Sequence, residues 1–140
     1  MTKIEEEMRE WYVIKIRAKI GGGVGESNEA TLLNRILRRF PDRFEYEADP
    51  KHVQEIIKGL HLKEGSKGLD WAARKASESE VSEAVPLEAS QAAKYRSLTA
   101  RANFLALDRA DIQFAVKELC REMSMPTTLS WCRLKQLGRY

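Results

Sequence analysis

Cysteine and histidine are scarce in this 140-residue chain, and no long hydrophobic run occurs in it. Two cysteines are too few for a disulfide framework, and neither they nor the two histidines have the spacing of metal ligands. No apolar segment approaches the roughly 18 residues that a membrane-spanning helix needs. The first ten residues are acidic, whereas a secretory signal begins basic and then turns apolar. We therefore expect a cytoplasmic or nuclear protein, not secreted and not membrane-bound, without a metal or cofactor of its own.

Sequence motifs of nucleophilic catalysis and phosphate binding are also missing. The serines form no G-x-S-x-G pattern. The glycine-rich stretch 21–25 is followed by Glu26, Ser27 and Asn28, whereas a phosphate loop needs a lysine and then serine or threonine. Glu26 would also repel phosphate, so this stretch predicts a hairpin loop.

One pair of carboxylates, Asp108 and Asp111, has a spacing that could serve acid–base or Mg²⁺ chemistry. Asp111, however, lies where a helix needs an N-cap, and Arg109 is available to balance Asp108. We expect a structural role for this pair and predict no catalytic residue in the chain.

Short alternating segments fill the first part of the sequence. Residues 11–20 place Tyr, Ile and Ala on one side and Val, Lys and Arg on the other, which predicts a strand with one basic face. A second candidate strand covers 30–40, although its leucines also fit a helical stripe. A turn signal precedes a third alternating segment at 44–48. Together they predict a small antiparallel meander.

A short helix is predicted directly after this meander. Asp49 can accept backbone N–H groups at a helix start, and Pro50 has no N–H to lose. Apolar residues then recur at helical spacing, so we expect a helix over 50–60. Residues 63–90 are rich in Lys, Glu, Ser, Gly and Ala, which is typical of a mobile linker, and Trp71 could dock it.

Three amphipathic helices are predicted from residue 91 onwards. The first has apolar stripes on two sides, the second has an almost uninterrupted core face that includes Cys120, and the third follows Pro126 and is capped by Thr127 or Thr128. The last pattern runs to the end of the chain, as expected of a truncated unit. Their apolar positions are Tyr95, Leu98, Ala102 and Leu105 with Ala100, Phe104 and Leu107; then Ile112, Ala115, Val116, Leu119, Cys120 and Met123; then Leu129, Leu134, Leu137 and Tyr140.

The expected fold class is therefore α+β, with a small antiparallel β-meander and one short helix, a linker, and a three-helix C-terminal unit. The predicted segments are an acidic N-terminal extension (1–10), the meander with its helix (11–62), a variable linker (63–90) and the truncated helical unit (91–140).

Net charge is distributed in blocks, although the whole chain carries only +3. Residues 11–43 carry seven basic and three acidic groups, and residues 91–140 carry nine and four, whereas 1–10 and 44–90 are acidic. Clustered cations are the requirement for sequence-independent contact with phosphates. Helix faces that are merely exposed to solvent would produce the same blocks of charge, so the blocks alone do not distinguish the two interpretations. The candidate nucleic-acid contacts are Lys15, Arg17, Lys19, Arg35, Arg38, Arg39, Lys94, Arg101, Lys135 and Arg139.

A motif can be read from residue 95 to the end. Residues 95–140 are YRSLTARANFLALDRADIQFAVKELCREMSMPTTLSWCRLKQLGRY. This stretch resembles the pattern Y-R-x-L-x-(G/A)-x-L-x-Y-L-(x)-x-R-P-D-I-x-x-A-V, followed by a proline-started W-x-x-x-K-R-x-x-R-Y-L helix, of the Copia-type retrotransposon Pol polyproteins. Residues 36–62 look like the hairpin and short helix that follow the reverse-transcriptase palm in that family. The residues that carry the resemblance are Tyr95, Arg96, Leu98, Asn103, Phe104, Leu105, Arg109, Asp111, Ile112, Ala115, Val116, Pro126, Trp131, Leu134, Lys135, Arg139 and Tyr140.

The resemblance implies a segment between the palm and RNase H, with a thumb- or connection-like role. The parent enzyme copies RNA into DNA with Mg²⁺ held by palm aspartates, and both catalytic sets are expected outside this chain. The implied partners are an RNA–DNA hybrid or template–primer and the palm and RNase H domains. Three positions depart from the pattern: Ala110 replaces a proline, Ala102 replaces a leucine, and Gly138 interrupts a helix.

Two other functions are consistent with the sequence. One is a domesticated basic nucleic-acid-binding module, which requires the cations to form a continuous face. The other is a helical protein-interaction domain, which requires an exposed apolar patch that could include Phe114 and Trp131.

Overall fold

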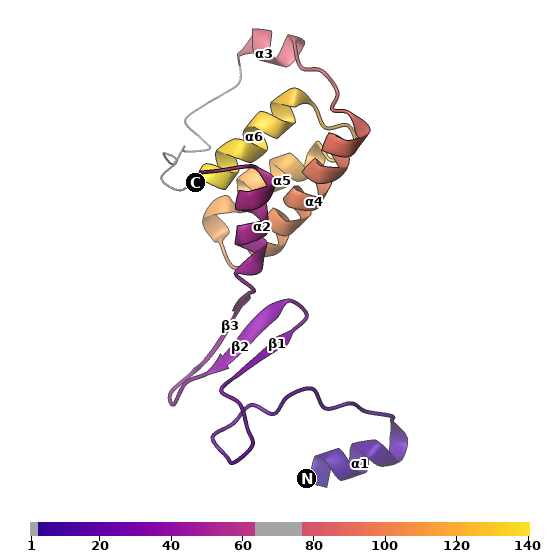
Figure 1. Ribbon diagram of the computed structural model, residues 1–140, viewed down its shortest axis with the longest axis vertical. Coiled ribbons are helices and arrows are strands. Elements are labelled where there is room, and N and C mark those ends of the chain that lie inside the picture. Colours follow the sequence, from indigo (N-terminus) through magenta and orange to yellow (C-terminus); the bar gives the residue numbers. More distant parts are fainter. Residues whose placement is uncertain (1–2, 64–76) are drawn as a thin grey trace. The chain divides into compact units, whose positions relative to one another are not determined.

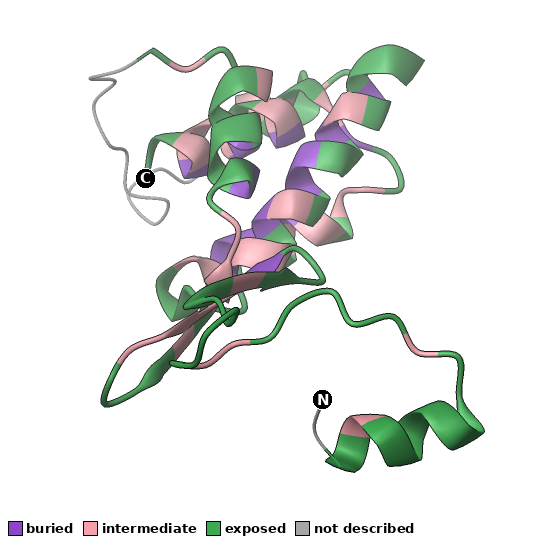
Figure 2. Ribbon diagram, turned by 60° about the horizontal axis from the view of Figure 1, so that its bottom comes forward, coloured by how far each residue is buried: buried purple, intermediate pink, exposed green. Residues whose placement is uncertain are grey.

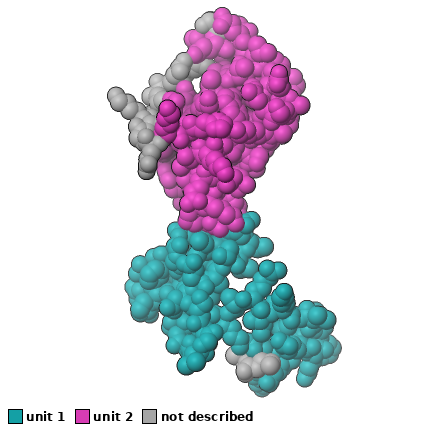
Figure 3. Space-filling view, viewed as in Figure 1, with its two compact units in different colours: residues 1–47 teal, residues 48–140 magenta. Residues whose placement is uncertain are grey.

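The chain forms two compact units, residues 1–47 and 48–140, in the computed structural model (Figures 1 and 3). The structure describes residues 3–63 and 77–140. No helix within these ranges has both the length and the apolar character needed to cross a bilayer. The elements are α1 (Lys3–Trp11), β1 (Glu29–Leu32), β2 (Arg35–Arg39), β3 (Phe44–Ala48), α2 (Lys51–Gly59), α3 (Glu78–Ser82), α4 (Ala89–Leu105), the 3₁₀ helix η2 (Ala110–Ile112), α5 (Gln113–Arg121) and α6 (Thr128–Arg139).

A three-stranded antiparallel sheet in the order β1-β2-β3 confirms the expected α+β class and the meander. The predicted single strand over 30–40 is instead a hairpin, in which Thr31 pairs with Ile36. The turn consists of Leu33 and Asn34, both with positive φ angles of 51° and 62°. Two-residue hairpins favour this backbone because its twist matches that of the strands, and asparagine tolerates it well.

The prediction of a strand over 11–20 is wrong. Residue 11 ends α1, and residues 13–19 join no β-ladder; only an isolated bridge links Ile20 to Ser27. Val13 is fully exposed and Tyr12 is mostly exposed. Alternation of apolar side chains stabilises a strand only when a neighbouring strand pairs with it and a core covers one face. Neither condition is met for this segment.

The four long helices of the second unit pack around one hydrophobic core. Buried residues, purple on the ribbon of Figure 2, lie on the sides of these helices that face one another. The structure confirms the helices predicted over 50–60 and after residue 91. Cys120, expected to be buried on the core face, is half-buried and packs against the core. The core comprises Ile56, Leu60, Tyr95, Leu98, Ala102, Ala106, Ala115, Val116, Leu119, Leu134 and Leu137.

Helix α2 belongs to this second unit, whereas the sequence grouped it with the preceding strands. Its apolar face is covered by α4, because His52, Ile56 and Leu60 recur at helical spacing and are all buried. The Asp49 carboxylate accepts the Lys51 N–H at 3.0 Å, which is the capping chemistry expected of it, although Pro50 holds the cap position.

Two expectations about the ends and faces of α4 and α5 are wrong. The second apolar stripe of α4 is not covered as a whole: Ala100 and Leu107 are exposed, and Phe104 is half-buried. Asp111 is not the side-chain cap of α5, because it lies inside η2 and Ile112 holds the cap position. A 3₁₀ turn can begin a helix and move its first residue along the chain, which the sequence pattern does not reveal.

The start of α6 is capped as expected. The Thr127 hydroxyl accepts the Ser130 N–H at 3.3 Å, and the Ser130 hydroxyl accepts the Thr127 N–H at 2.9 Å. This reciprocal pair is a capping box, with serine in place of the usual glutamate or glutamine.

The region predicted to be a linker falls partly outside the described residues, which exclude 64–76 and with them Trp71. The part that is described contains α3 and is joined to the start of α6 by backbone hydrogen bonds. Leu87 N–H donates to Pro126 O, and Thr128 N–H donates to Val85 O, both at 2.9 Å.

Gly138 allows α6 to approach the C-terminal end of α2. A Cβ atom at this position would lie 2.6 Å from Leu60 Cδ1 and 3.0 Å from Leu62 Cδ1. Leu60 is only 1% exposed, so it has little room to move. The glycine that departs from the family pattern therefore fits the packing of this chain.

We predict that Gly138→Ala lowers the free energy of unfolding by about 1 kcal/mol. Alanine gains about 1 kcal/mol in helix propensity, but the clash with Leu60 costs about 1–3 kcal/mol. Urea denaturation followed by circular dichroism measures the difference. In a Leu60→Val background the same substitution should cost less, because the Cδ1 atom is gone. Stabilisation by Gly138→Ala in the wild-type background would contradict this account.

Candidate nucleic-acid interface

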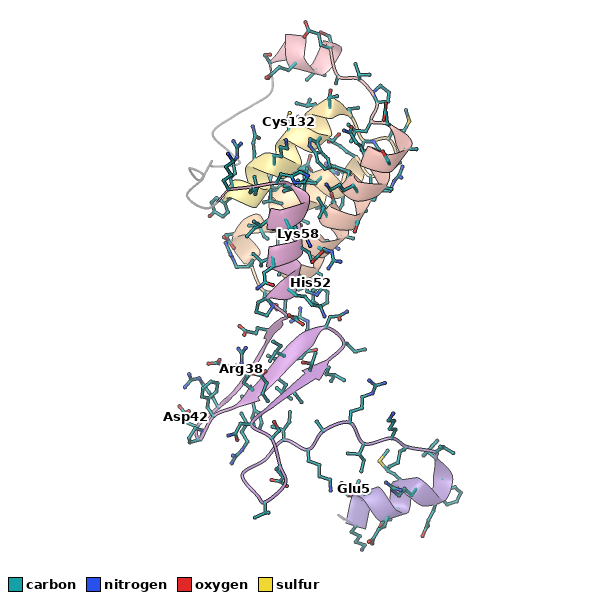
Figure 4. All side chains as sticks on the ribbon, viewed as in Figure 1. Glu5, Arg38, Asp42, His52, Lys58 and Cys132 are labelled. Carbon is teal, nitrogen blue, oxygen red and sulfur yellow. The ribbon has the colours of Figure 1, made fainter. Side chains whose placement is uncertain are left out.

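The arginines of β2 are engaged within the sheet. Arg38 donates to Glu29 Oε2 at 2.7 Å and to Glu47 Oε1, so it links all three strands (Figure 4). These hydrogen bonds, the one to Glu29 first, raise the pKa of Arg38 above its ordinary value. Arg35 is 8% exposed, and its guanidinium carbon lies 5.0 Å from the centroid of the Tyr46 ring. Both side chains therefore stabilise the meander.

The other candidates of the first unit have mixed surroundings. Lys19 forms an ion pair with Glu5 at 2.7 Å. Lys15 and Arg17 are exposed on the segment that joins no strand, and Arg39 is half-buried at the end of β2. The basic strand face expected from alternation therefore does not form, because its strand does not form.

The glycine-rich stretch forms a loop closed by backbone hydrogen bonds, but not the predicted hairpin, because the bridge between Ile20 and Ser27 is isolated and parallel. Gly21 N–H donates to Ser27 O at 3.2 Å, and Ser27 N–H donates to Lys19 O at 2.8 Å. The Glu26 carboxylate already accepts the Gly23 N–H at 2.8 Å. A carboxylate at that place opposes an anionic ligand.

Two candidate cations of the second unit, both on α4, lie against histidines of α2 and of the residues that directly follow it. Lys94 Nζ is 3.4 Å from His61 Nε2, and Arg101 Nη1 is 3.4 Å from His52 Nδ1. Within the described residues, neither cation has a carboxylate at ion-pair distance. We call these four side chains the α2–α4 seam. Among the described residues, no carboxylate neutralises the positive charge of Lys94 and Arg101.

Lys135 and Arg139 are one turn apart on α6, as their spacing predicted. Lys135 is half-buried and Arg139 is exposed. Neither forms an ion pair with a carboxylate in the part of the chain that the structure describes. They are two further positive charges of the second unit that could contact phosphate.

The imidazole of His52 is the most buried titratable group of the seam, at 7% exposure. It lies at the start of α2 (Figure 4), with its centroid 4.8 Å from that of the Phe104 ring. Its Nε2 atom is buried without a hydrogen-bond partner. Burial, then the charges of Arg101 and Lys51, lower the pKa of His52 below its ordinary value, and Asp49 opposes them weakly.

Asp108 and Asp111, the paired carboxylates of the sequence, are engaged in hydrogen bonds within the second unit. Asp111 accepts two hydrogen bonds from Arg109, at 2.9 and 2.7 Å, which lower the pKa of Asp111. Arg109 was expected to balance Asp108 instead; Asp108 accepts the Ala48 N–H at 2.9 Å. Across residues 3–63 and 77–140, no three side chains of histidine, cysteine, aspartate or glutamate gather in a way that could hold a metal ion.

An apolar groove of about 130 Å³ lies between α2, α4 and α6. Val53 and Ile57 are its exposed aliphatic residues on α2, at 45% and 41% exposure. The patch expected from Phe114 and Trp131 does not form, because Trp131 packs against the core and only Phe114 is exposed.

Comparison with known proteins gives one curated relative and no structural one. The chain is 28% identical over 132 aligned residues to a retrovirus-related Pol polyprotein from transposon RE2 of Arabidopsis thaliana. That similarity supports an origin in a retrotransposon Pol polyprotein. It covers 81% of this chain but 9% of the relative, so the chain spans less than a tenth of that polyprotein. No family model and no solved structure matches the chain.

We predict that the protein is less stable at pH 5.5 than at pH 7.5, in part through His52. Because its pKa is lower in the folded state, the unfolded chain binds the proton more readily. This stability is fully present above about pH 6.5, the ordinary histidine value, and is lost as the pH falls through the folded-state pKa. Urea denaturation at both pH values measures the loss. His52→Asn should reduce the pH dependence more than His61→Asn, and equal effects of the two would contradict the assignment.

Proposed function

We propose that this chain is a non-catalytic part of a Copia-type retrotransposon Pol polyprotein, from the stretch of the reverse transcriptase between palm and RNase H. There it acts as a thumb- or connection-like scaffold that joins the two catalytic domains and helps to hold template–primer. The proposal rests on the similarity to a Pol polyprotein over 81% of the chain and on what the motif residues do in the second unit.

The motif residues join helices to one another, which is the observation that carries the proposal. The Tyr95 hydroxyl, fully buried, donates to Leu119 O at 2.8 Å and so ties α4 to α5. Arg96 Nε donates to Met123 O at 2.8 Å, just beyond the end of α5. Arg109, the N-cap residue of η2, forms an ion pair with Asp111 inside that turn. Such contacts fix the packing of the helices. The side chains are therefore engaged in structural hydrogen bonds and an ion pair.

Contact with nucleic acid is proposed for the cations of the second unit. Phosphate contact requires positive charge that is not already neutralised by a carboxylate, because a bound phosphate would otherwise have to displace that partner. Lys94 and Arg101 meet this condition, and they are seven residues apart on α4, about 10 Å along its axis. Lys135 and Arg139 on α6 meet it too. Contacts of this kind position a duplex without reading its sequence.

A helical protein-interaction role is the second candidate. The apolar groove between α2, α4 and α6 favours it, because exposed Val53 and Ile57 border a hollow that also reaches the buried core residues Leu134 and Leu137. Association through this groove would be insensitive to salt, whereas phosphate contact would weaken steeply as salt is added.

We predict that the double variant Lys94→Gln, Arg101→Gln weakens binding to an RNA–DNA hybrid and flattens its salt dependence. Each lost phosphate contact reduces the slope of log affinity against log salt by about 0.9 on a B-form duplex and by a comparable amount here. Fluorescence anisotropy across a salt series measures both quantities. Lys117→Gln, an exposed lysine of α5 without an ion pair, is the matched control. An unchanged slope in the double variant would show that the α2–α4 seam does not contact the phosphates of the hybrid.

We also predict that the isolated chain neither extends a primer nor cleaves the RNA strand of a hybrid in the presence of Mg²⁺. Both reactions require carboxylates that hold metal ions near the scissile or growing strand. A primer-extension and a hybrid-cleavage assay test this directly. Mg²⁺-dependent synthesis that is lost on Asp108→Asn, Asp111→Asn would contradict the proposal.

A further inference from the structure

Helix α1 has an apolar stripe that is exposed to solvent. Ile4, Met8 and Trp11 recur at the i, i+4, i+7 spacing of one helix face, and Trp11 is 79% exposed. None of the nine residues of α1 is buried, and the helix is almost wholly green in Figure 2. A helix this short is marginal in water unless its apolar face packs against another surface. The stripe therefore needs a partner.

The polar part of α1 is acidic. Four glutamates against one lysine and one arginine give the helix a net charge of −2. Glu7 lies three residues after Ile4 and four before Trp11, so it borders the apolar stripe. Its ion pair with Lys3, at 3.9 Å between two exposed side chains, is weak. Nucleic acid and anionic lipid repel an acidic helix, so the partner that fits α1 is an apolar groove bordered by cations.

The groove between α2, α4 and α6 has this character. Helices α4 and α6 contain three basic residues each and no acidic one. Lys135 lies three residues before Gly138, which lines the groove, so both are on the same side of α6. The one acidic residue of α2, Glu55, lies two residues from both Val53 and Ile57 and is therefore on a different face of that helix.

The volume of the groove suits one aromatic side chain. It is about 130 Å³, and a protein cavity of about 150 Å³ lined by aliphatic and aromatic groups holds a benzene molecule. Leu134 and Leu137 provide an apolar wall. Arg109 and Tyr140 also line the groove, and both are side chains that pack favourably against an aromatic ring. Among the three residues of the α1 stripe, Trp11 fits this space.

We propose that α1 of one copy of the chain docks in the groove between α2, α4 and α6 of a second copy. Trp11 enters the groove, and Glu7 lies toward the cations of α6. This contact goes beyond the scaffold role and rests on the second candidate function, because it names the partner of the groove. A nine-residue helix buries less than the about 800 Å² per partner of a standard interface, so we expect weak, concentration-dependent self-association. The charges select the partner more than they add affinity, so the association should persist at high salt.

Sedimentation velocity of the full chain, from about 10 µM to about 1 mM, measures this association. Trp11→Ser should weaken it about tenfold, since truncation of a tryptophan anchor has effects of this size. Val53→Glu should also weaken it, because it places a carboxylate at the edge of a groove that receives an acidic helix. Phe114→Ser is the matched control and should associate like the wild type, since Phe114 is 70% exposed and does not line the groove. Circular dichroism verifies that each variant is folded.

A mixture of the two weakened variants is the sharper test. The proposed contact joins two unlike surfaces, so the intact groove of Trp11→Ser can receive the intact α1 of Val53→Glu. The mixture should therefore associate more tightly than either variant alone. A contact between two like surfaces would not be restored in this way. Restoration would also show that each variant keeps the surface that it was not designed to lose.

The other outcomes separate this contact from the proposed functions. A wild-type protein that stays monomeric up to the highest concentration would overturn the contact and leave the scaffold role, which hybrid binding measures, unaffected. Weakening by Val53→Glu but not by Trp11→Ser would overturn the contact and keep the groove as an interaction surface. Failure of the mixture to restore association would also overturn the contact. Association that neither substitution weakens would overturn the contact and the second candidate function together.

Discussion

The close packing of α2 against α4 and α6 is the constraint on which the second unit depends. Two glycines permit it: a Cβ atom at Gly59 would lie 2.7 Å from Leu98 Cδ2, and one at Gly138 would lie 2.6 Å from Leu60 Cδ1. Protein interiors are packed densely enough that such contacts leave no room for an added methyl group. The same packing brings His52 and His61, at the two ends of α2, against cations of α4. The position of the seam thus follows from the core beneath it.

Electrostatics divides the candidate cations by their surroundings. In the first unit Lys19 and Arg38 are paired with carboxylates and Arg35 is buried over Tyr46, so these charges hold the local structure. In the second unit Lys94 and Arg101 face imidazole nitrogens, which accept hydrogen bonds but carry no negative charge when neutral. The number of basic residues in a block therefore does not measure its capacity to bind phosphate.

The motif residues acquire a physical meaning from their contacts. Tyr95 donates a hydrogen bond to a carbonyl oxygen inside α5, and Arg96 donates one to a carbonyl oxygen just beyond its end. These interactions hold the helices at fixed angles to one another, as the proposed supporting role requires. The similarity to a retrotransposon Pol polyprotein over 81% of this chain supports an origin in such a polyprotein, although the chain spans only 9% of that relative.

The sequence by itself determined the parts of the structure that are local. Apolar residues at helical spacing predicted α2, α4, α5 and α6, and the capping residues before α6 predicted its start, because both signals act within a few residues. Alternation over 11–20 failed, since a strand exists only beside another strand. Only the tertiary structure decided which cations have no carboxylate partner among the described residues, and that both histidines lie against α4. Those properties depend on what packing brings opposite each side chain, and spacing along the chain does not contain that information.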